Sequence, residues 1–153
     1  MKVVIQRVAH ASVAVDGETV GSCNKGYLIL LGVAAGDTDT DAELLCTKIA
    51  NLRIFTDENG KMNRSIKDID GEVLVIFQFT LMANYRHGNR PDFMASAPAA
   101  EADRLYEYFK TLMGREVRRV ESGVFGAHME VSLLNDGPVT IVMDSEVLKA
   151  KGK

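Results

Sequence analysis

The chain has 153 residues, of which 46% are hydrophobic and 25% are charged, as expected for one soluble globular domain. Its formal net charge of −3 argues against a strongly basic nucleic-acid-binding protein but leaves room for one local basic patch. No apolar run reaches the ~20 residues that a membrane-spanning helix needs. Polar residues also interrupt the apolar start of the chain, so no secretory signal is expected. We therefore expect a cytoplasmic protein without a membrane anchor, whose Cys23 and Cys46 are free thiols.

The first 35 residues predict a β meander. They are rich in β-branched side chains, and Asp16–Gly17 is a hairpin-turn signal. The expected strands span residues 3–8, 11–15, 19–23 and 27–34. Apolar residues at helical spacing then predict a helix that begins near residues 37–40 and ends near residue 52. Residues 57–60 predict a turn and residues 61–70 a polar loop.

The apolar run 73–83 predicts a strand that crosses the core, but it contains Gln78 and Thr80. Side chains two apart on a strand point to the same face. Burying such polar groups without partners costs about 1–3 kcal/mol each. Either hidden partners satisfy them, or this face opens onto a pocket.

The second half predicts a long loop at 84–98, an amphipathic helix at 99–113 that Gly114 closes, and three strands. The strands are expected at 117–120, 129–134 and 139–143, with a frayed tail at roughly 146–153. Two basic patches occur, for which charge alone favours solvated surface: Arg86, His87 and Arg90 in the loop, and Lys110, Arg115, Arg118 and Arg119 around the helix end. No linker divides the chain, so residues 1–153 predict a single α+β domain with two main helices.

No familiar catalytic motif is present. The sequence has no phosphate-binding glycine loop, no paired-histidine or Cys-x-x-Cys spacing, and no nucleophile elbow. We therefore expect no metal and no cofactor. The segment NDGPVT at 135–140 favours an ordinary hairpin turn, with Pro138 opening the next strand.

Two segments, QFTL at 78–81 and NDGPVT at 135–140, resemble the signature motifs of the D-aminoacyl-tRNA deacylases, formerly called D-tyrosyl-tRNA deacylases. The resemblance continues in order through VIQRV at 4–8, KGYLILLGV at 25–33 and GVFGAHMEVSL at 123–133. It implies mixed and antiparallel sheets that form a barrel-like layer, and a homodimer. It also implies hydrolysis of the ester bond between a D-amino acid, or glycine mischarged on alanine tRNA, and the 3′-terminal adenosine of tRNA.

The resemblance assigns the catalytic positions to Gln78, Phe79 and Thr80. The backbone N–H groups of Phe79 and Thr80 would stabilise the developing oxyanion, while Gln78 supports the adenosine or the ester and the tRNA 2′-OH assists. Thr80 could instead be a nucleophile, but no base that would activate its hydroxyl is visible in the sequence. An orienting or structural role for Thr80 is therefore favoured over nucleophilic attack.

The resemblance assigns chirality selection to Gly137 and Pro138. In the family this pair has a cis peptide bond and reaches into the partner subunit's pocket, where its carbonyl groups meet the α-amino group and exclude an L side chain. Arg7 and Asn135 would support the motif. Since both are present here, rejection of L-amino acids is expected.

The pocket-lining positions implied by the resemblance are Phe77, Phe125, Ala127 and Met129. Position 77 is usually Ser in the family, so the Phe77 ring replaces a hydroxyl beside the expected oxyanion site. Two alternatives follow. One is a non-catalytic module that binds the tRNA 3′ end and whose site Phe77 has blunted. The other is a Thr80-dependent hydrolase of small esters or amides.

Overall fold

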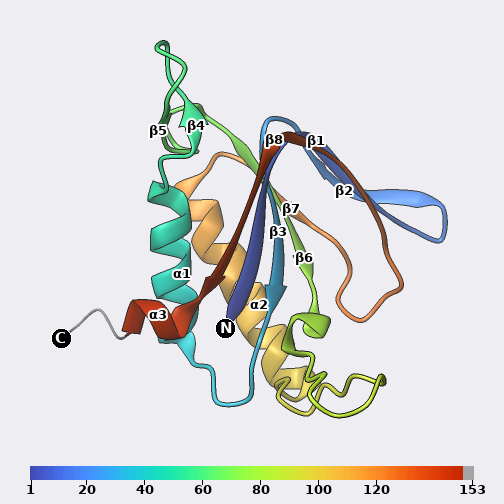
Figure 1. Cartoon of the computed structure of the whole chain (residues 1–153). Helices are drawn as coiled ribbons and strands as arrows, with labels where there is room; N and C mark the ends of the chain where they lie inside the picture. Colours follow the sequence, from blue (N-terminus) through green and yellow to red (C-terminus); the bar gives the residue numbers. More distant parts are fainter. Residues whose placement is uncertain (150–153) are drawn as a thin grey trace.

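The computed structural model describes residues 1–149 and consists of one mixed sheet with helices on one face (Figure 1). The sheet contains β1 (Lys2–Val15), β2 (Glu18–Cys23), β3 (Gly26–Gly32), β6 (Glu72–Phe77), β7 (Val120–Ser122) and β8 (Glu130–Asp144). A separate hairpin pairs β4 (Phe55–Thr56) with β5 (Met62–Arg64). Helices α1 (Asp39–Asn51) and α2 (Ala99–Glu116) pack side by side, and α3 (Ser145–Lys149) contacts α1. None of the described helices is both long and apolar enough to cross a membrane.

The long strand β1 organises the sheet because it pairs along both edges. One edge pairs with β3 and then with β2, while the other edge pairs with β8 over nearly its whole length. At the far side β2 approaches β7 so closely that a Cβ on Gly21 would lie 2.5 Å from the carbonyl oxygen of Ser122. The sheet therefore curls into a nearly closed barrel-like layer, and the predicted α+β class is confirmed.

The core has two parts, on the two faces of this curled sheet. The larger part lies between the sheet and the helices α1 and α2, and a smaller part lies inside the curl. Strand β1 serves both cores in succession, because its first half buries Val3 and Ile5 in the larger core and its second half contributes to the smaller one. The smaller core contains Val8, Ala11, Val13, Cys23, Leu28, Leu74 and Ile76.

Several predicted elements were wrong in detail. The first strands do not form a meander, because β3 returns to pair with β1 rather than with β2. The supposed polar loop 61–70 contributes strand β5. Gly114 does not close the second helix, which continues to Glu116. The strand expected at 117–120 begins only at Val120, where it pairs with Val73.

The expected frayed tail is a helix over Ser145–Lys149, while residues 150–153 of that prediction lie outside the described part of the chain. Helix α3 forms because it docks on the first turn of α1. Ser145 Oγ donates a 2.6 Å hydrogen bond to Asp41 Oδ1, and Lys149 Nζ lies 2.8 Å from the same oxygen. Tertiary contacts thus order a segment whose composition suggested no structure.

Candidate active site

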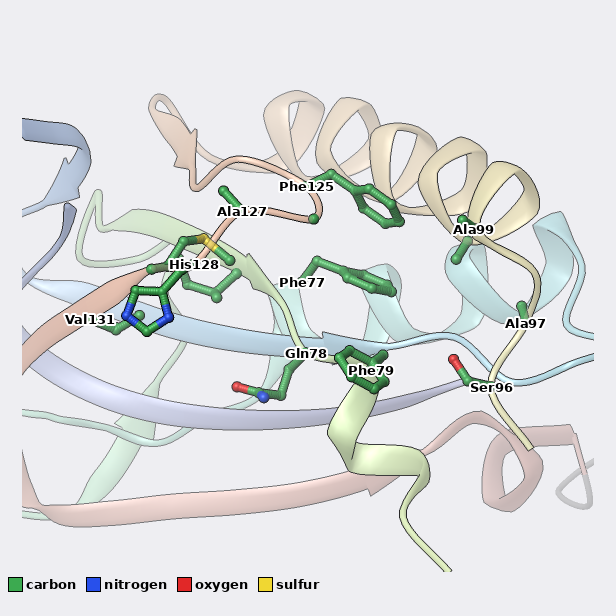
Figure 2. A pocket seen from close by; sticks show the side chains of 14 residues that line it. Phe77, Gln78, Phe79, Ser96, Ala97, Ala99, Phe125, Ala127, His128 and Val131 are labelled. Atoms are coloured by element: carbon green, nitrogen blue, oxygen red, sulfur yellow. The ribbon is translucent and has the colours of Figure 1, made fainter. Parts of the chain in front are cut away.

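A cavity of about 460 Å³ lies where β6 ends, between the start of α2 and the segment before β8 (Figure 2). This volume falls in the range of roughly 300–1,000 Å³ that is typical of small-molecule sites. Figure 2 shows Phe77 and Phe125 near one another, with Phe79 and Ser96 at one end of the cavity and His128 at the other. Its lining consists of Ile76, Phe77, Gln78, Phe79, Ser96, Ala97, Ala99, Ala102, Phe125, Gly126, Ala127, His128, Met129 and Val131.

The strand expected at 73–83 ends at Phe77, and a 3-10 helix, η1 (Phe79–Met82), follows it. The N–H of Gln78 makes a last 2.7 Å bond to the carbonyl of Leu31, after which the chain turns. Gly32 permits this turn, because a Cβ there would lie only 2.9–3.0 Å from atoms of Met82, Gln78 and Leu81. The chain therefore leaves the sheet at the edge of the cavity.

This turn changes the environment of the two polar side chains. Gln78 and Thr80 do not share a buried strand face; Gln78 is half-buried and Thr80 is exposed. The Gln78 amide Nε2 donates a hydrogen bond to Thr80 Oγ1, so each side chain has a partner. Gln78 lines the cavity and Thr80 does not.

The same turn determines whether two backbone N–H groups, those of Phe79 and Thr80, have hydrogen-bond acceptors. The first hydrogen bond of η1 runs from the N–H of Leu81 to the carbonyl of Gln78, at 3.2 Å. Phe79 and Thr80 precede this donor, so their N–H groups have no acceptor inside the helix. Such donors are available to a group bound at the edge of the cavity.

An aromatic cluster forms one wall of the cavity. The Phe77 ring lies 4.4 Å from the Phe125 ring and 5.8 Å from the Tyr106 ring, measured between centroids. Aromatic pairs of this kind contribute about 0.5–1.5 kcal/mol beyond simple burial. Burial raises the pKa of Tyr106, whose hydroxyl lies 3.4 Å from the carbonyl oxygens of Val75 and Gly123. Phe77 is thus part of a packed wall, and the cavity beside it is open.

The segment NDGPVT is not a hairpin turn between two strands, because β8 is continuous and bulges within itself. Gln6 pairs with Thr140 and Val8 pairs with Asn135, so four residues of β8 face one residue of β1. The four bulged residues, 136–139, include Gly137 and Pro138, which are exposed and joined by a cis peptide bond.

Two side chains hold this bulge. Arg7 is the β1 residue opposite it; Nε donates to the carbonyl of Asp136 at 2.8 Å, and Nη1 donates to the carbonyl of Ile54 at 2.7 Å. Asn135 closes the bulge from within, since its Oδ1 accepts from the N–H of Val139 at 2.8 Å and its Nδ2 donates to Thr140 Oγ1 at 3.0 Å. Together they anchor both ends of the exposed segment.

The cavity brings together six of the residues singled out in the sequence: Phe77, Gln78, Phe79, Phe125, Ala127 and Met129. Gly137 and Pro138 do not line the cavity of their own chain. The sequence interpretation missed the lining residues around the start of α2, which are Ser96, Ala97, Ala99 and Ala102. For the first three of them the only signal is the run of small residues ASAPAA at 95–100. Within residues 1–149, no cluster of three or more His, Cys, Asp or Glu side chains could hold a metal ion.

The fold and the site define a single-domain α+β protein whose cavity lies where a central strand gives way to a 3-10 helix. The family described as D-Tyr-tRNA(Tyr) deacylase matches residues 4–144. The chain is 57% identical to a D-aminoacyl-tRNA deacylase of Caldicellulosiruptor saccharolyticus over 95% of this chain and 98% of that protein. It is 56% identical to one of Ruegeria pomeroyi over 94% and 99%. The chain therefore belongs to the D-aminoacyl-tRNA deacylase family of ester hydrolases.

Solved structures agree with this fold. A structure described as c-Myc DNA Unwinding Element Binding Protein is 41% identical, with a TM-score of 0.89 over 94% of this chain and 98% of that one. A structure described as a probable eukaryotic D-amino acid tRNA deacylase is only 16% identical but has a TM-score of 0.81 over the same shares. The latter likeness concerns the fold alone.

Proposed function

We propose that this protein hydrolyses the ester bond of D-aminoacyl-tRNA in the cytoplasm and releases free D-amino acid and tRNA. The observation that carries the proposal is the position of the cavity directly beside the QFTL segment, with Gln78 and Phe79 in its lining. The cavity is large enough for an aminoacyl group and part of the terminal adenosine. Family membership supplies the reaction class.

The proposed chemistry needs no side-chain nucleophile. Water adds to the ester carbonyl, the bond to the ribose oxygen breaks, and a proton passes to that oxygen, with the neighbouring 2′-OH assisting. The N–H groups of Phe79 and Thr80 stabilise the oxyanion, a role worth about 3–4 kcal/mol per donor. Gln78 orients the adenosine or the ester. Thr80 orients Gln78, a role supported by the hydrogen bond that its hydroxyl accepts from the Gln78 amide.

Selection of the D hand is proposed to come from Gly137 and Pro138 of a second copy of the chain. These residues are exposed and do not line their own cavity, which fits a role in the cavity of a second copy. Among the described strands β8 pairs only with β1, and Leu134 and Val142 are exposed on it, at 50% and 73%. An unpaired edge with exposed apolar side chains favours association into a homodimer.

Exclusion of L side chains by shape predicts which aminoacyl groups are hydrolysed. Backbone carbonyls that meet the α-amino group leave no room for an L side chain but make no demand on a D side chain. Glycine carries no side chain, so it is not rejected either. Hydrolysis of glycine mischarged on alanine tRNA therefore follows from the same proposed mechanism.

The test is deacylation of D-Tyr-tRNA, L-Tyr-tRNA and Gly-tRNA(Ala) by the purified protein. Release of D-Tyr and glycine with L-Tyr-tRNA intact is expected, whereas no turnover of any of the three substrates would refute the proposal. Binding of the tRNA 3′ end without turnover would favour the non-catalytic alternative, for which Phe77→Ser should then restore hydrolysis. Thr80→Ala tests the other alternative, the Thr80-dependent hydrolase, because a Thr80 nucleophile predicts total loss of activity in a folded variant.

A further inference from the structure

The loop between η1 and α2, residues 84–94, lies in the chain between two parts of the cavity lining, Phe79 before it and Ser96 after it. Its base is closed by paired bonds between Asn84 and Asp92, from the N–H of each residue to the carbonyl of the other, at 2.8 and 3.0 Å. Beyond the loop, the N–H of Ala97 bonds to the carbonyl of Val33 at 3.0 Å. In Figure 1 the loop is the yellow-green segment that projects at the lower right, beyond the end of β6. The two ends of the loop are therefore tied to each other, and the segment that follows it is tied to the chain just after β3.

Aromatic side chains run from the cavity onto this loop. Phe79, in the cavity lining, packs edge-on against Phe93 of the loop, with ring centroids 5.0 Å apart. Tyr85 and Met94 are then 80% and 86% exposed, among the most exposed large apolar side chains of the described residues. Exposed rings beside a cavity suit flat ligands such as nucleic-acid bases.

The loop also presents positive charge that the protein does not neutralise. Within residues 1–149, Arg86 and Arg90 form no salt bridge. The one carboxylate of the loop, Asp92, is occupied, because it accepts hydrogen bonds from the Asn84 amide and the N–H of Met94.

The second basic patch behaves differently. Lys110 pairs with Glu107 at 2.9 Å, Arg118 pairs with Glu72 at 2.9 Å, and Arg119 pairs with Glu121. Three of its four cations are thus neutralised within the fold. In a chain of net charge −3, the patch beside the cavity leaves both of its arginines without a salt bridge within residues 1–149, whereas the other patch leaves only Arg115.

From this combination we infer that residues 84–94 bind the single-stranded 3′ end of tRNA immediately upstream of the terminal adenosine. Arg86 and Arg90 contact its phosphates, and Tyr85 stacks on a base. Positive side chains that follow a backbone, together with exposed aromatic rings, are the usual means of holding single strands. The inference rests on the proposed function, since it takes the terminal adenosine to occupy the cavity.

The experiment compares two substrates, D-Tyr-tRNA and D-tyrosyl-adenosine, an ester that carries no upstream phosphates. The double variant Arg86→Gln/Arg90→Gln should lose about 10-fold in kcat/KM on the tRNA. The slope of log kcat/KM against the logarithm of the salt concentration should become shallower by about 1.4, which is about 0.7 for each of two single-strand phosphate contacts. Its kcat/KM on D-tyrosyl-adenosine should not change. Tyr85→Ala should lose about 10-fold on the tRNA only, and Tyr85→Phe should restore it.

The matched control is Lys25→Gln/Lys61→Gln, which removes the same charge from exposed lysines that also form no salt bridge within residues 1–149. An equal loss in this control, or an equal loss on both substrates, would overturn the inference. If the wild type hydrolyses neither substrate, the proposed function fails, and fluorescence anisotropy with labelled uncharged tRNA then decides the inference by itself. Weaker binding by the arginine variant than by the lysine control supports the inference, and identical binding refutes it.

Discussion

Replacing Arg7 by lysine tests how the exposed bulge is held. Arg7 is only 9% exposed, and its guanidinium joins the carbonyl of Asp136 to that of Ile54 through two separate nitrogens. A lysine keeps the charge, but its single ammonium lacks the forked geometry that reaches both carbonyls. One charge-assisted hydrogen bond is therefore lost, at a cost of about 1.5–3 kcal/mol.

The loss of stability should lower Tm by about 5 °C, since about 1 kcal/mol corresponds to ~2–4 °C in a domain of this size. The effect on activity should be larger, because the bulge carries Gly137 and Pro138. A misplacement of ~1 Å at a reacting group can cost about 100-fold in rate. We expect kcat/KM on D-Tyr-tRNA to fall by about this factor in Arg7→Lys, together with the D-to-L preference. Calorimetry and paired deacylation assays measure the two effects.

The control is Arg53→Lys, which changes an exposed arginine whose Nε also donates to a backbone carbonyl, that of Asn63, at 3.0 Å. A surface change of this kind should stay within about 0.5 kcal/mol. Equal loss of stability in the two variants would refute the anchoring role of Arg7. An unchanged D-to-L preference in Arg7→Lys would refute the link between the bulge and chirality selection.

Three further predictions concern other parts of the molecule. Phe77→Ser removes ring contacts with Phe125 and should lower the free energy of unfolding by about 2 kcal/mol, less than the ~3–5 kcal/mol lost with a fully buried ring. Hydrolysis of D-Tyr-tRNA should persist, and its loss in a folded variant would contradict this prediction. Burial opposes the charge on Asp41, but hydrogen bonds from Lys149 and its other partners outweigh it and lower the pKa of Asp41 from 3.8 to about 2. Its carboxylate thus contributes about 2 kcal/mol of stability above pH ~4, and this contribution is lost as pH falls through about 2. The free energy of unfolding of Asp41→Asn should therefore depend less on pH over that window than that of the wild type. Burial raises the pKa of Cys23 and Cys46 to about 11, so an aromatic disulfide reagent at pH 8 should label neither thiol until denaturant is added, and rapid native labelling would show that they are accessible.

Local pattern was sufficient where one face of an element determines its burial. The amphipathic spacing after residue 98 predicted α2, and its buried residues Leu105, Tyr106 and Phe109 are those on the predicted face. The β-branched runs likewise predicted β2 and β3, and they predicted β1 as two strands, 3–8 and 11–15, where the structure has one continuous strand. The predicted boundaries of elements were wrong where tertiary contacts outweigh local propensity. Helix α3 is an example, because the buried carboxylate of Asp41 holds it in place.

The candidate site shows the same division more sharply. The apolar run 73–83 has no sequence signal for the end of its strand. That end depends on the close approach of Met82 to Gly32, which lies at the end of a different strand, β3. The bulge at 136–139 is likewise invisible in the sequence, because it exists only relative to the register of β1. The small residues around Ala97 become cavity lining only when α2 packs across the end of β6.

The sequence by itself determined helices α1 and α2, the apolar runs that form the central strands, the absence of a familiar catalytic motif, and the two segments that identify the family. These follow from residue type and short-range spacing, which local geometry converts directly into burial. Tertiary structure alone decided that Gln78 and Phe79 border a cavity and that Arg7 faces the bulge. It also decided that, within residues 1–149, the arginines beside the cavity form no salt bridge while most of the other patch is neutralised. The reason is that each of these properties is a relation between residues distant in the chain, fixed only when the strands choose their partners and register.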